Sequence, residues 1–248
     1  MKKCELEAND INIRNSLIDD KLENKEYLSS LIRLISNIDD NEVICIDGYW
    51  GVGKTFLLKQ LMYLIMHYKE NNNQEKFKVV EAEKNILLNI CNNNMVFYYN
   101  AWENDEHSDV LESIIYNILN CYPKYKNEVT SKFDKEDAVK EVLNILTKIV
   151  SNKFFNIDLS AEKIEKIKTF NDLSDEINTY EERKALFETL INKILAGKRM
   201  ILIIDELDRC NPYYATKLLE TIKHFYNLSN VTVIMASNNN ELQNTIKK

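Results

Sequence analysis

Gly48-Tyr49-Trp50-Gly51-Val52-Gly53-Lys54-Thr55 matches the pattern G-x-x-x-x-G-K-[ST], which is typical of a loop that wraps phosphate groups. The apolar run at residues 43–46 predicts a buried strand that leads into the loop, and leucines at helical spacing over residues 56–68 predict a helix after it. The alternative is a strand, a glycine-rich turn and a helix without a ligand. The chain has four glycines, and three of them lie in this stretch, which favours a phosphate site.

The residue types of this loop fit phosphate chemistry. Gly48 and Gly53 can adopt backbone angles closed to other residues, so the loop can surround an anion with its N–H groups. Lys54 would contact the β- and γ-phosphates as a catalytic cation, and Thr55 would place a hydroxyl on Mg²⁺. The predicted nucleotide-binding residues are Gly48, Tyr49, Trp50, Gly51, Val52, Gly53, Lys54, Thr55 and Phe56.

Composition excludes several classes of function. A net charge of −7 provides no global basic field, so there is no strong signal for nucleic-acid binding. The five cysteines form no C-x-x-C pair and the first residues lack a secretory signal, so we expect reduced thiols and a cytoplasmic location. The three histidines have no metal-ligand spacing. No apolar run approaches the ~18 residues that indicate a membrane span.

The order of apolar runs and helical patterns predicts the fold class. Strands are expected at residues 43–46, 95–99, 200–204 and 231–236, with helices between them. Near-continuous apolar strands that alternate with helices indicate an α/β fold with three layers and a mostly parallel sheet. In such sheets, ligands bind beyond the carboxyl ends of the strands. The residues at or just beyond those ends are Gly48, Asn100, Asp205 and Asn238.

We divide the chain into four parts. Residues 1–26 are a polar and loosely attached lead-in, residues 27–120 form the first part of the core, residues 121–180 form an all-helical insertion, and residues 181–248 complete the core. The insertion is expected to hold helices near 135–150 and 161–167, and it is either a partner-binding segment or a packed elaboration. A further helix over 181–196 ends at Gly197.

Acidic residues follow the predicted strand at 200–204. Asp205 suits an acid that holds Mg²⁺ opposite Thr55, and Glu206 suits a catalytic group that polarises the attacking water. The alternative is a charged helix start, since carboxylates stabilise helix N-termini. Asn238 or Ser237 would hydrogen-bond the γ-phosphate or the water in a catalytic role, unless they are turn residues.

Two further features of the same region carry open interpretations. Asp208 and Arg209 are expected to form an ion pair that shapes the acidic segment, or Arg209 reaches phosphate in a neighbouring subunit. Trp50 and Trp102 are more typical of packing residues than of residues that stack on a ligand.

These residues together resemble the KAP family of P-loop ATPases, a branch of the additional-strand, catalytic-glutamate NTPases. The family's loop, typically G-x-W-G-x-G-K-[ST], is similar to residues 48–55, including Trp50. Its metal segment, an apolar strand followed by D-D-L-D-R-C, is similar to residues 205–210, with Glu206 in place of the second Asp. Residues 100–102 read N-A-W, like the family's signature after a strand. The resemblance spans about residues 27–248.

The resemblance also implies several differences from relatives. It implies the strand order 5-1-4-3-2, but members usually continue past the fourth strand with a final strand and a helical lid. This chain ends at Lys248, where that region should begin, so we expect both to be absent. Many members carry membrane-spanning helices between the two motifs, which this chain lacks. Relatives often have Asp-Arg where this chain has Asn238-Asn239.

The resemblance implies Mg²⁺-dependent binding and slow hydrolysis of ATP, which would switch a conformation. The switch would act on an unidentified protein partner or on a self-assembly, and some relatives are linked to bacterial or phage conflict. The first alternative is a non-hydrolysing interaction module that binds nucleotide. A small-molecule kinase is a weaker alternative, because the Asp205-Glu206 pair suits activation of water.

Overall fold

The computed structural model describes residues 7–20, 22–38, 42–70, 73–107, 109–121, 188–189, 191–225, 228 and 230–246. The chain divides into two compact units, one made of Met1–Pro123 and Lys198–Lys248 and the other of Lys124–Gly197. Apart from Cys121, the predicted insertion over 121–180 lies outside the described residues. In the second unit, residues 191–195 are helical. Gly197 follows them with a φ of +88°, as expected for a glycine that ends a helix.

The first unit is organised around a sheet of four parallel strands in the order β1-β4-β3-β2. The strands are β1 Val43–Asp47, β2 Asn94–Asn100, β3 Arg199–Asp205 and β4 Val231–Ser237. The central strand β3 is apolar and fully buried from Met200 to Ile204, as expected for a parallel strand covered on both faces. The α/β fold class and the order of these four strands are confirmed.

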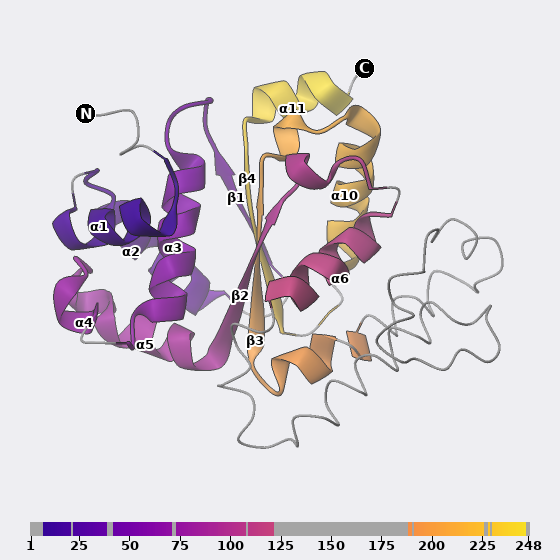
Figure 1. Ribbon diagram of the computed structural model, residues 1–248. Helices are drawn as coiled ribbons and strands as arrows, with labels where there is room; N and C mark the ends of the chain where they lie inside the picture. Colours follow the sequence, from indigo (N-terminus) through magenta and orange to yellow (C-terminus); the bar gives the residue numbers. More distant parts are fainter. Residues whose placement is uncertain are drawn as a thin grey trace, which may run out of the picture. The chain divides into compact units, whose positions relative to one another are not determined.

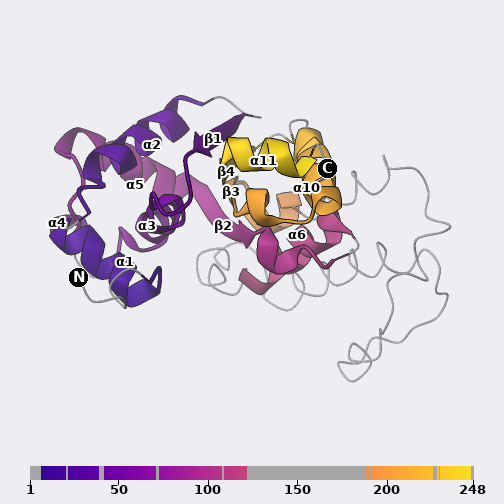
Figure 2. The ribbon, with the colours of Figure 1, turned by 90° about the horizontal axis from the view of Figure 1, so that it is seen from above.

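Helices cover both faces of this sheet and make three layers. Figures 1 and 2 show α1 to α5 on one face, and α6 and α10 on the other. The α-helices are α1 Asp10–Asp19, α2 Lys25–Asn37, α3 Lys54–His67, α4 Asn73–Lys76, α5 Lys84–Asn93, α6 Val110–Cys121, α10 Pro212–Phe225 and α11 Asn239–Ile246. The described residues also form the short 3-10 helices η2 Glu81–Glu83, η3 Trp102–Asn104 and η7 Leu207–Arg209.

The core on the α3 side fixes the helix that follows the phosphate loop. Leu58, Leu61 and Leu64 of α3 are fully buried together with Ile201 and Ile203 of β3. Burial of each such side chain contributes about 1.5–3 kcal/mol relative to exposure. These contacts hold α3 against the sheet, so that its first turn lies next to the carboxyl end of β1.

The start of the chain is more tightly attached than the sequence predicts. Residues 10–19 form α1, which buries Ile13 and Leu17 in the same core as α3. Gln60 of α3 is 1 % exposed and donates a hydrogen bond of 2.8 Å to Ser16 Oγ. The expectation of a loosely attached lead-in is thus wrong for α1, because its two buried apolar residues lie one turn apart and share one face.

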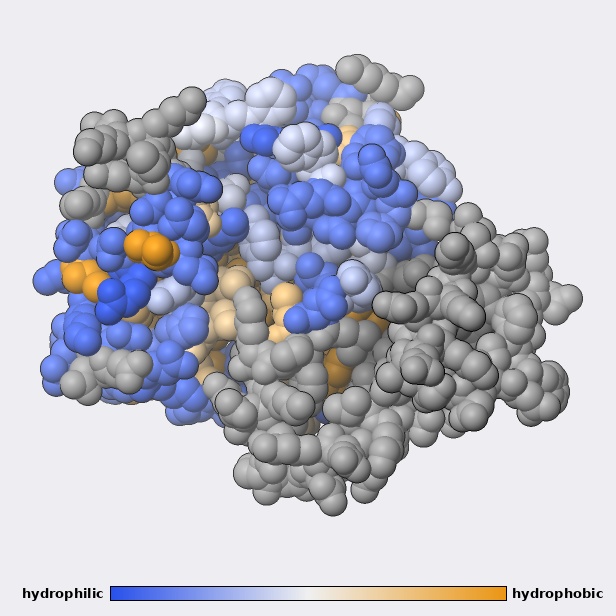
Figure 3. All heavy atoms as spheres, viewed as in Figure 1, coloured by the Kyte–Doolittle hydropathy of each residue, from blue (hydrophilic) through white to orange (hydrophobic). Residues whose placement is uncertain are grey.

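The surface of the first unit is mostly hydrophilic in the view of Figure 3, and its few strongly hydrophobic residues are scattered. Ile11 of α1 is one of the exposed apolar side chains. Among the helices that the structure describes, none is both long enough and apolar enough for a membrane span.

Candidate nucleotide-binding site

The carboxyl ends of the four strands bring the predicted site residues to one edge of the sheet. Asp47 pairs with Ser237, and Asn100 pairs with Asp205. Gly48 N–H donates to the Ser237 carbonyl at 3.2 Å, which ties the start of the phosphate loop to the end of β4. Residues that are far apart in the sequence thus meet at one edge, as expected for a parallel sheet.

The loop between β1 and α3 takes its shape from two glycines. Gly51 and Gly53 have φ values of +82° and +95°, a region that favours glycine. Gly48 does not have a positive φ, so the expectation that it supplies unusual backbone angles is wrong. Its constraint is close approach, because a Cβ on Gly48 would lie 3.1 Å from Val52 Cγ2. Gly53 then stands directly before Lys54, the first residue of α3.

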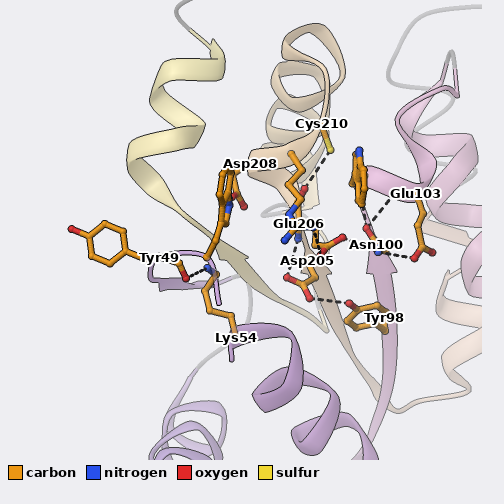
Figure 4. A network of polar contacts seen from close by, with 12 residues as sticks. Tyr49, Lys54, Tyr98, Asn100, Glu103, Asp205, Glu206, Asp208 and Cys210 are labelled. Atoms are coloured by element: carbon orange, nitrogen blue, oxygen red, sulfur yellow. Dashed lines mark hydrogen bonds and ion pairs between the residues drawn. The ribbon is translucent and has the colours of Figure 1, made fainter. Parts of the chain in front are cut away.

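Lys54 points back onto its own loop. Its Nζ donates to the Gly48 carbonyl. It also donates to the Tyr49 carbonyl at 3.1 Å, as Figure 4 shows. A cation held by neutral carbonyls is ready to move to phosphate oxygens, which bind it more strongly. This geometry fits the role predicted for Lys54.

Apart from Trp50, the remaining loop residues offer mainly their backbone to a ligand. The side chains of Tyr49 and Val52 are exposed, whereas the Phe56 side chain is buried in the core beside α3. Phe56 can therefore meet a ligand only with its backbone N–H at the helix N-terminus, where the dipole favours anions. Thr55 lies in the same first turn of α3 and is partly exposed.

Asp205 is the buried acid at the end of β3. It is 2 % exposed, and its Oδ2 accepts a hydrogen bond of 2.8 Å from the Tyr98 hydroxyl of β2. Its Oδ1 accepts from the Glu206 N–H at 2.9 Å. Burial and the Asp205 carboxylate raise the pKa of Tyr98, so its hydroxyl keeps its proton and stays a donor. Tyr98 lies two residues before Asn100, on the same face of β2.

Glu206 lies beside Asp205 and is held on both sides. Its Oε1 lies 3.2 Å from Arg209 Nη1, and its Oε2 accepts from Asn100 Nδ2 at 3.2 Å. Glu206 precedes η7 and makes no side-chain cap hydrogen bond, so its carboxylate is held by Arg209 and Asn100. The catalytic role predicted for Glu206 stays a prediction. Burial raises the pKa of the Cys210 thiol to about 12, and this thiol donates to the Glu206 carbonyl.

Asp208 and Arg209 have different partners from those expected. Arg209 pairs with Glu206, and Asp208 accepts a hydrogen bond of 2.5 Å from Trp50 Nε1 of the phosphate loop. The expectation of an Asp208–Arg209 ion pair is wrong, because Glu206 adopts a left-handed φ of +60° that starts the tight turn of η7. Trp50 and Trp102 are 55 % and 49 % exposed, and both contact Arg209. That they pack rather than stack on a ligand stays a prediction.

The end of β4 completes the edge. Asn238 is buried, and its carbonyl accepts from Leu242 N–H in the first turn of α11. Ser237 Oγ donates to Asn239 Oδ1 at 3.0 Å, while Asn239 N–H donates to Asp47 Oδ1 at 2.9 Å. The catalytic role predicted for Asn238 stays a prediction.

The donor set fits Mg²⁺ that shares its ligands with a nucleotide. Among the described residues, no group of three or more His, Cys, Asp or Glu side chains could hold a metal alone. Mg²⁺ is usually bound by one or two carboxylates or hydroxyls together with substrate phosphates and water. Thr55 and Asp205 supply one hydroxyl and one carboxylate of this kind, so a phosphate-bearing ligand would complete the set.

Sequence reasoning missed the contributions of Tyr98 and of the Trp50–Asp208 contact. The sequence does contain a signal for Tyr98. Alternate residues of a strand share a face, so the Tyr98 hydroxyl is expected on the same face of β2 as Asn100. The link between Trp50 and Asp208 joins segments that are 158 residues apart, and no local pattern predicts it.

The comparisons with known proteins agree with this geometry. No curated protein matches the chain. A family model described as the KAP family P-loop domain matches residues 24–248, which include the phosphate loop, the end of β2 and the acidic segment after β3. The chain therefore belongs to the KAP family of P-loop domains.

Proposed function

We propose that this protein binds ATP together with Mg²⁺ and hydrolyses it slowly to ADP and phosphate. Membership of a P-loop family implies nucleotide binding. The observation that carries the proposal is the pair Asp205 and Glu206 at the end of β3, at the edge of the sheet where Lys54 begins α3. Two adjacent carboxylates in different settings can divide metal binding and activation of water between them.

The residues of the site would act in the following way. Lys54 leaves the carbonyls of its loop and binds the β- and γ-phosphates, while loop N–H groups surround them. Thr55 and Asp205 would hold Mg²⁺, which neutralises phosphate charge when it is bound. Glu206 orients a water in line with the γ-phosphorus and takes its proton as the bond to ADP breaks. Asn238 would hydrogen-bond the γ-phosphate or this water.

A non-hydrolysing nucleotide-binding module is the second candidate. It is favoured by the state of Glu206, whose two carboxylate oxygens contact Arg209 and Asn100. Each carboxylate oxygen thus already has one partner within the fold, which fits a side chain that holds the segment after β3 in place. In this alternative, the nucleotide would stabilise the fold and an interaction surface without turnover.

Phosphate release from the purified chain separates the two candidates. We expect ATP- and Mg²⁺-dependent release in the wild type, and a loss of about 100-fold or more in Glu206→Gln, because a positioned general base contributes 10²–10⁴-fold. Glu206→Gln should still bind ATP in calorimetry. Glu220→Gln, on the exposed side of α10, is the matched control and should keep the wild-type rate. Equal rates in the wild type and Glu206→Gln would favour the non-hydrolysing module.

The resemblance to the KAP family also supports a proposal for what the nucleotide cycle does. We propose that the cycle switches a conformation that acts on a protein partner or on a second copy of this chain. A cytoplasmic location and a role in bacterial or phage conflict belong to the same proposal. Sedimentation of the wild type with ATP, with ADP and without nucleotide tests self-association. A sedimentation coefficient that is the same in all three states contradicts a nucleotide-dependent assembly.

A further inference from the structure

Arg209 is the centre of a cluster that joins three segments of the sheet edge. Its Cζ lies 5.9 Å from the ring centroid of Trp50 and 5.5 Å from that of Trp102. Its Nη1 lies 3.2 Å from Glu206 Oε1. A guanidinium within about 6 Å of an indole centroid is attracted by the ring face. The phosphate loop, the end of β2 and the segment after β3 therefore meet at one cation.

Trp50 is held at a second point. Its Nε1 donates to Asp208 Oδ2 at 2.5 Å, and Asp208 is 6 % exposed. A half-exposed tryptophan in a glycine-containing loop would otherwise keep several rotamers. The hydrogen bond to a buried carboxylate orients the indole, so that Trp50 contacts the residue next to Arg209 as well as Arg209 itself.

Glu206 has a backbone conformation that its surroundings must maintain. Its φ of +60° lies in the left-handed region, which is unfavourable for a residue other than glycine. Two sets of contacts stabilise this conformation. The Glu206 N–H donates to Asp205 Oδ1, and the Glu206 carboxylate contacts Arg209 and Asn100. Strained residues held in this way cluster at functional sites.

We propose that Arg209 is a positioning residue for Glu206, and that Trp50 makes this position depend on the state of the phosphate loop. The inference rests on the proposed function, because the position of Glu206 affects a rate only if the chain hydrolyses nucleotide. Trp50 follows Tyr49, whose carbonyl accepts a hydrogen bond from Lys54. When Lys54 turns from this carbonyl to a phosphate, the contacts beside Trp50 change, and Arg209 transmits the change to Glu206.

The chain offers a direct spectroscopic readout of this cluster. It contains two tryptophans, and both flank Arg209. Intrinsic tryptophan fluorescence therefore reports on the cluster without a label. We expect the emission to change when ATP and Mg²⁺ are added to the wild type, and the response of Trp50→Phe to show which indole is responsible.

The decisive variants are Arg209→Met and Arg209→Lys. We expect kcat for phosphate release to fall about tenfold in Arg209→Met while KM for ATP stays within about twofold, because an interaction that matters in the transition state is lost. Arg209→Lys keeps the charge without the planar guanidinium and should restore part of kcat. Lys217→Met is the matched control, since Lys217 lies over the Tyr213 ring on α10, 4.6 Å from its centroid, and should change neither constant.

The outcomes separate this inference from the proposed function. Phosphate release that does not depend on Glu206 overturns the proposed function and with it this inference. Release that depends on Glu206 but keeps its wild-type kcat in Arg209→Met overturns the inference alone. Equal losses in Arg209→Met and Arg209→Lys, with no ATP-induced change in tryptophan emission, also overturn it. Circular dichroism of each variant confirms that the active fraction is folded.

Discussion

The phosphate loop after β1 and the acidic segment after β3 lie at the same edge of the sheet but are built differently. The loop follows from backbone geometry, with positive φ at Gly51 and Gly53, and its Tyr49 side chain is exposed. The acidic segment follows from side-chain contacts, since buried Asp205 and Asp208 each accept a hydrogen bond from another segment. The loop takes its shape from glycines, which lack a side chain. The acidic segment takes its shape from the hydrogen bonds of its side chains.

This difference predicts two kinds of variant. Changes in the loop should weaken nucleotide binding and leave most of the fold unchanged, because few side chains pack there. Changes in the acidic segment should affect metal dependence, turnover and stability together, because its carboxylates are shared with other strands.

Lys54→Ala should have the largest effect. The ammonium has two carbonyl acceptors in its own loop and would exchange them for phosphate oxygens. Its loss should weaken ATP binding by about 100-fold or more, which corresponds to about 2.7 kcal/mol. Isothermal titration calorimetry with ATP and Mg²⁺ measures this change.

Lys223→Ala is the matched control for the lysine. Lys223 is an exposed residue of α10, so its removal changes the net charge equally and should leave affinity unchanged. If Lys54→Ala binds ATP as tightly as Lys223→Ala does, the loop does not hold the phosphates.

Asp205→Asn should separate metal binding from phosphate binding. The amide keeps the shape of the side chain and one acceptor oxygen, so it can keep the hydrogen bond from either Tyr98 or Glu206 N–H. It loses the charge that holds Mg²⁺. We expect the Mg²⁺ concentration for half-maximal ATP binding to rise about 30-fold, or about 2 kcal/mol. In EDTA, Asp205→Asn should bind ATP with the same affinity as the wild type. The control is Asp10→Asn, at the exposed start of α1, which should leave the Mg²⁺ dependence unchanged. An unchanged Mg²⁺ dependence would remove Asp205 from the metal site.

The sequence predicts the strands of this fold better than it predicts the contacts of the site. The four apolar runs are sufficient to predict the four strands, because a parallel strand is buried on both faces. The polar residues that follow these runs mark the edge of the sheet where the site lies. Residue type, together with the position of ligands beyond the carboxyl ends of parallel strands, also predicts that Lys54 and Asp205 lie at a common edge. These predictions depend on local composition and on one rule of topology.

The contacts around Arg209 could not be predicted in the same way. Asp208 and Arg209 are neighbours in sequence and have opposite charges, so an ion pair between them was the simplest expectation. The left-handed backbone at Glu206 instead places Arg209 near Glu206 and leaves Asp208 to Trp50. Likewise the sequence does not reveal how firmly α1 is attached, because its two buried apolar residues are few in a polar segment.

Gly53→Ala also tests the phosphate loop, and its expected effect is smaller than that of Lys54→Ala. Gly53 has a φ of +95°, and a Cβ there would meet nothing within 4 Å. The expected cost is therefore conformational, about 1–2 kcal/mol. Gly197→Ala is the control, because Gly197 also has a positive φ and open space. Both variants should lower the free energy of unfolding in urea, but only Gly53→Ala should weaken ATP binding; equal affinity in the two would contradict a phosphate-binding role for this turn.

Tyr98→Phe tests the acidic side and should have the smallest effect. The variant removes the hydroxyl that donates to Asp205 and should lower the free energy of unfolding at pH 7 by about 1.5 kcal/mol. This is the lower end of the range for a hydrogen bond to a charged group, because Asp205 keeps the Glu206 N–H as a donor. Urea unfolding followed by circular dichroism measures the difference from the wild type.

The same variant predicts a dependence on pH with a defined sign. The pKa of Tyr98 is raised in the folded state, mainly by burial and by Asp205, so its contribution to stability is complete below the unfolded pKa of about 10. Above that pH the unfolded chain loses the proton first, and the contribution declines. The difference between the wild type and Tyr98→Phe should therefore shrink as the pH rises from 9 to 11, since other tyrosines are common to both. A difference that grows over this range would mean that Tyr98 does not keep its proton beside Asp205.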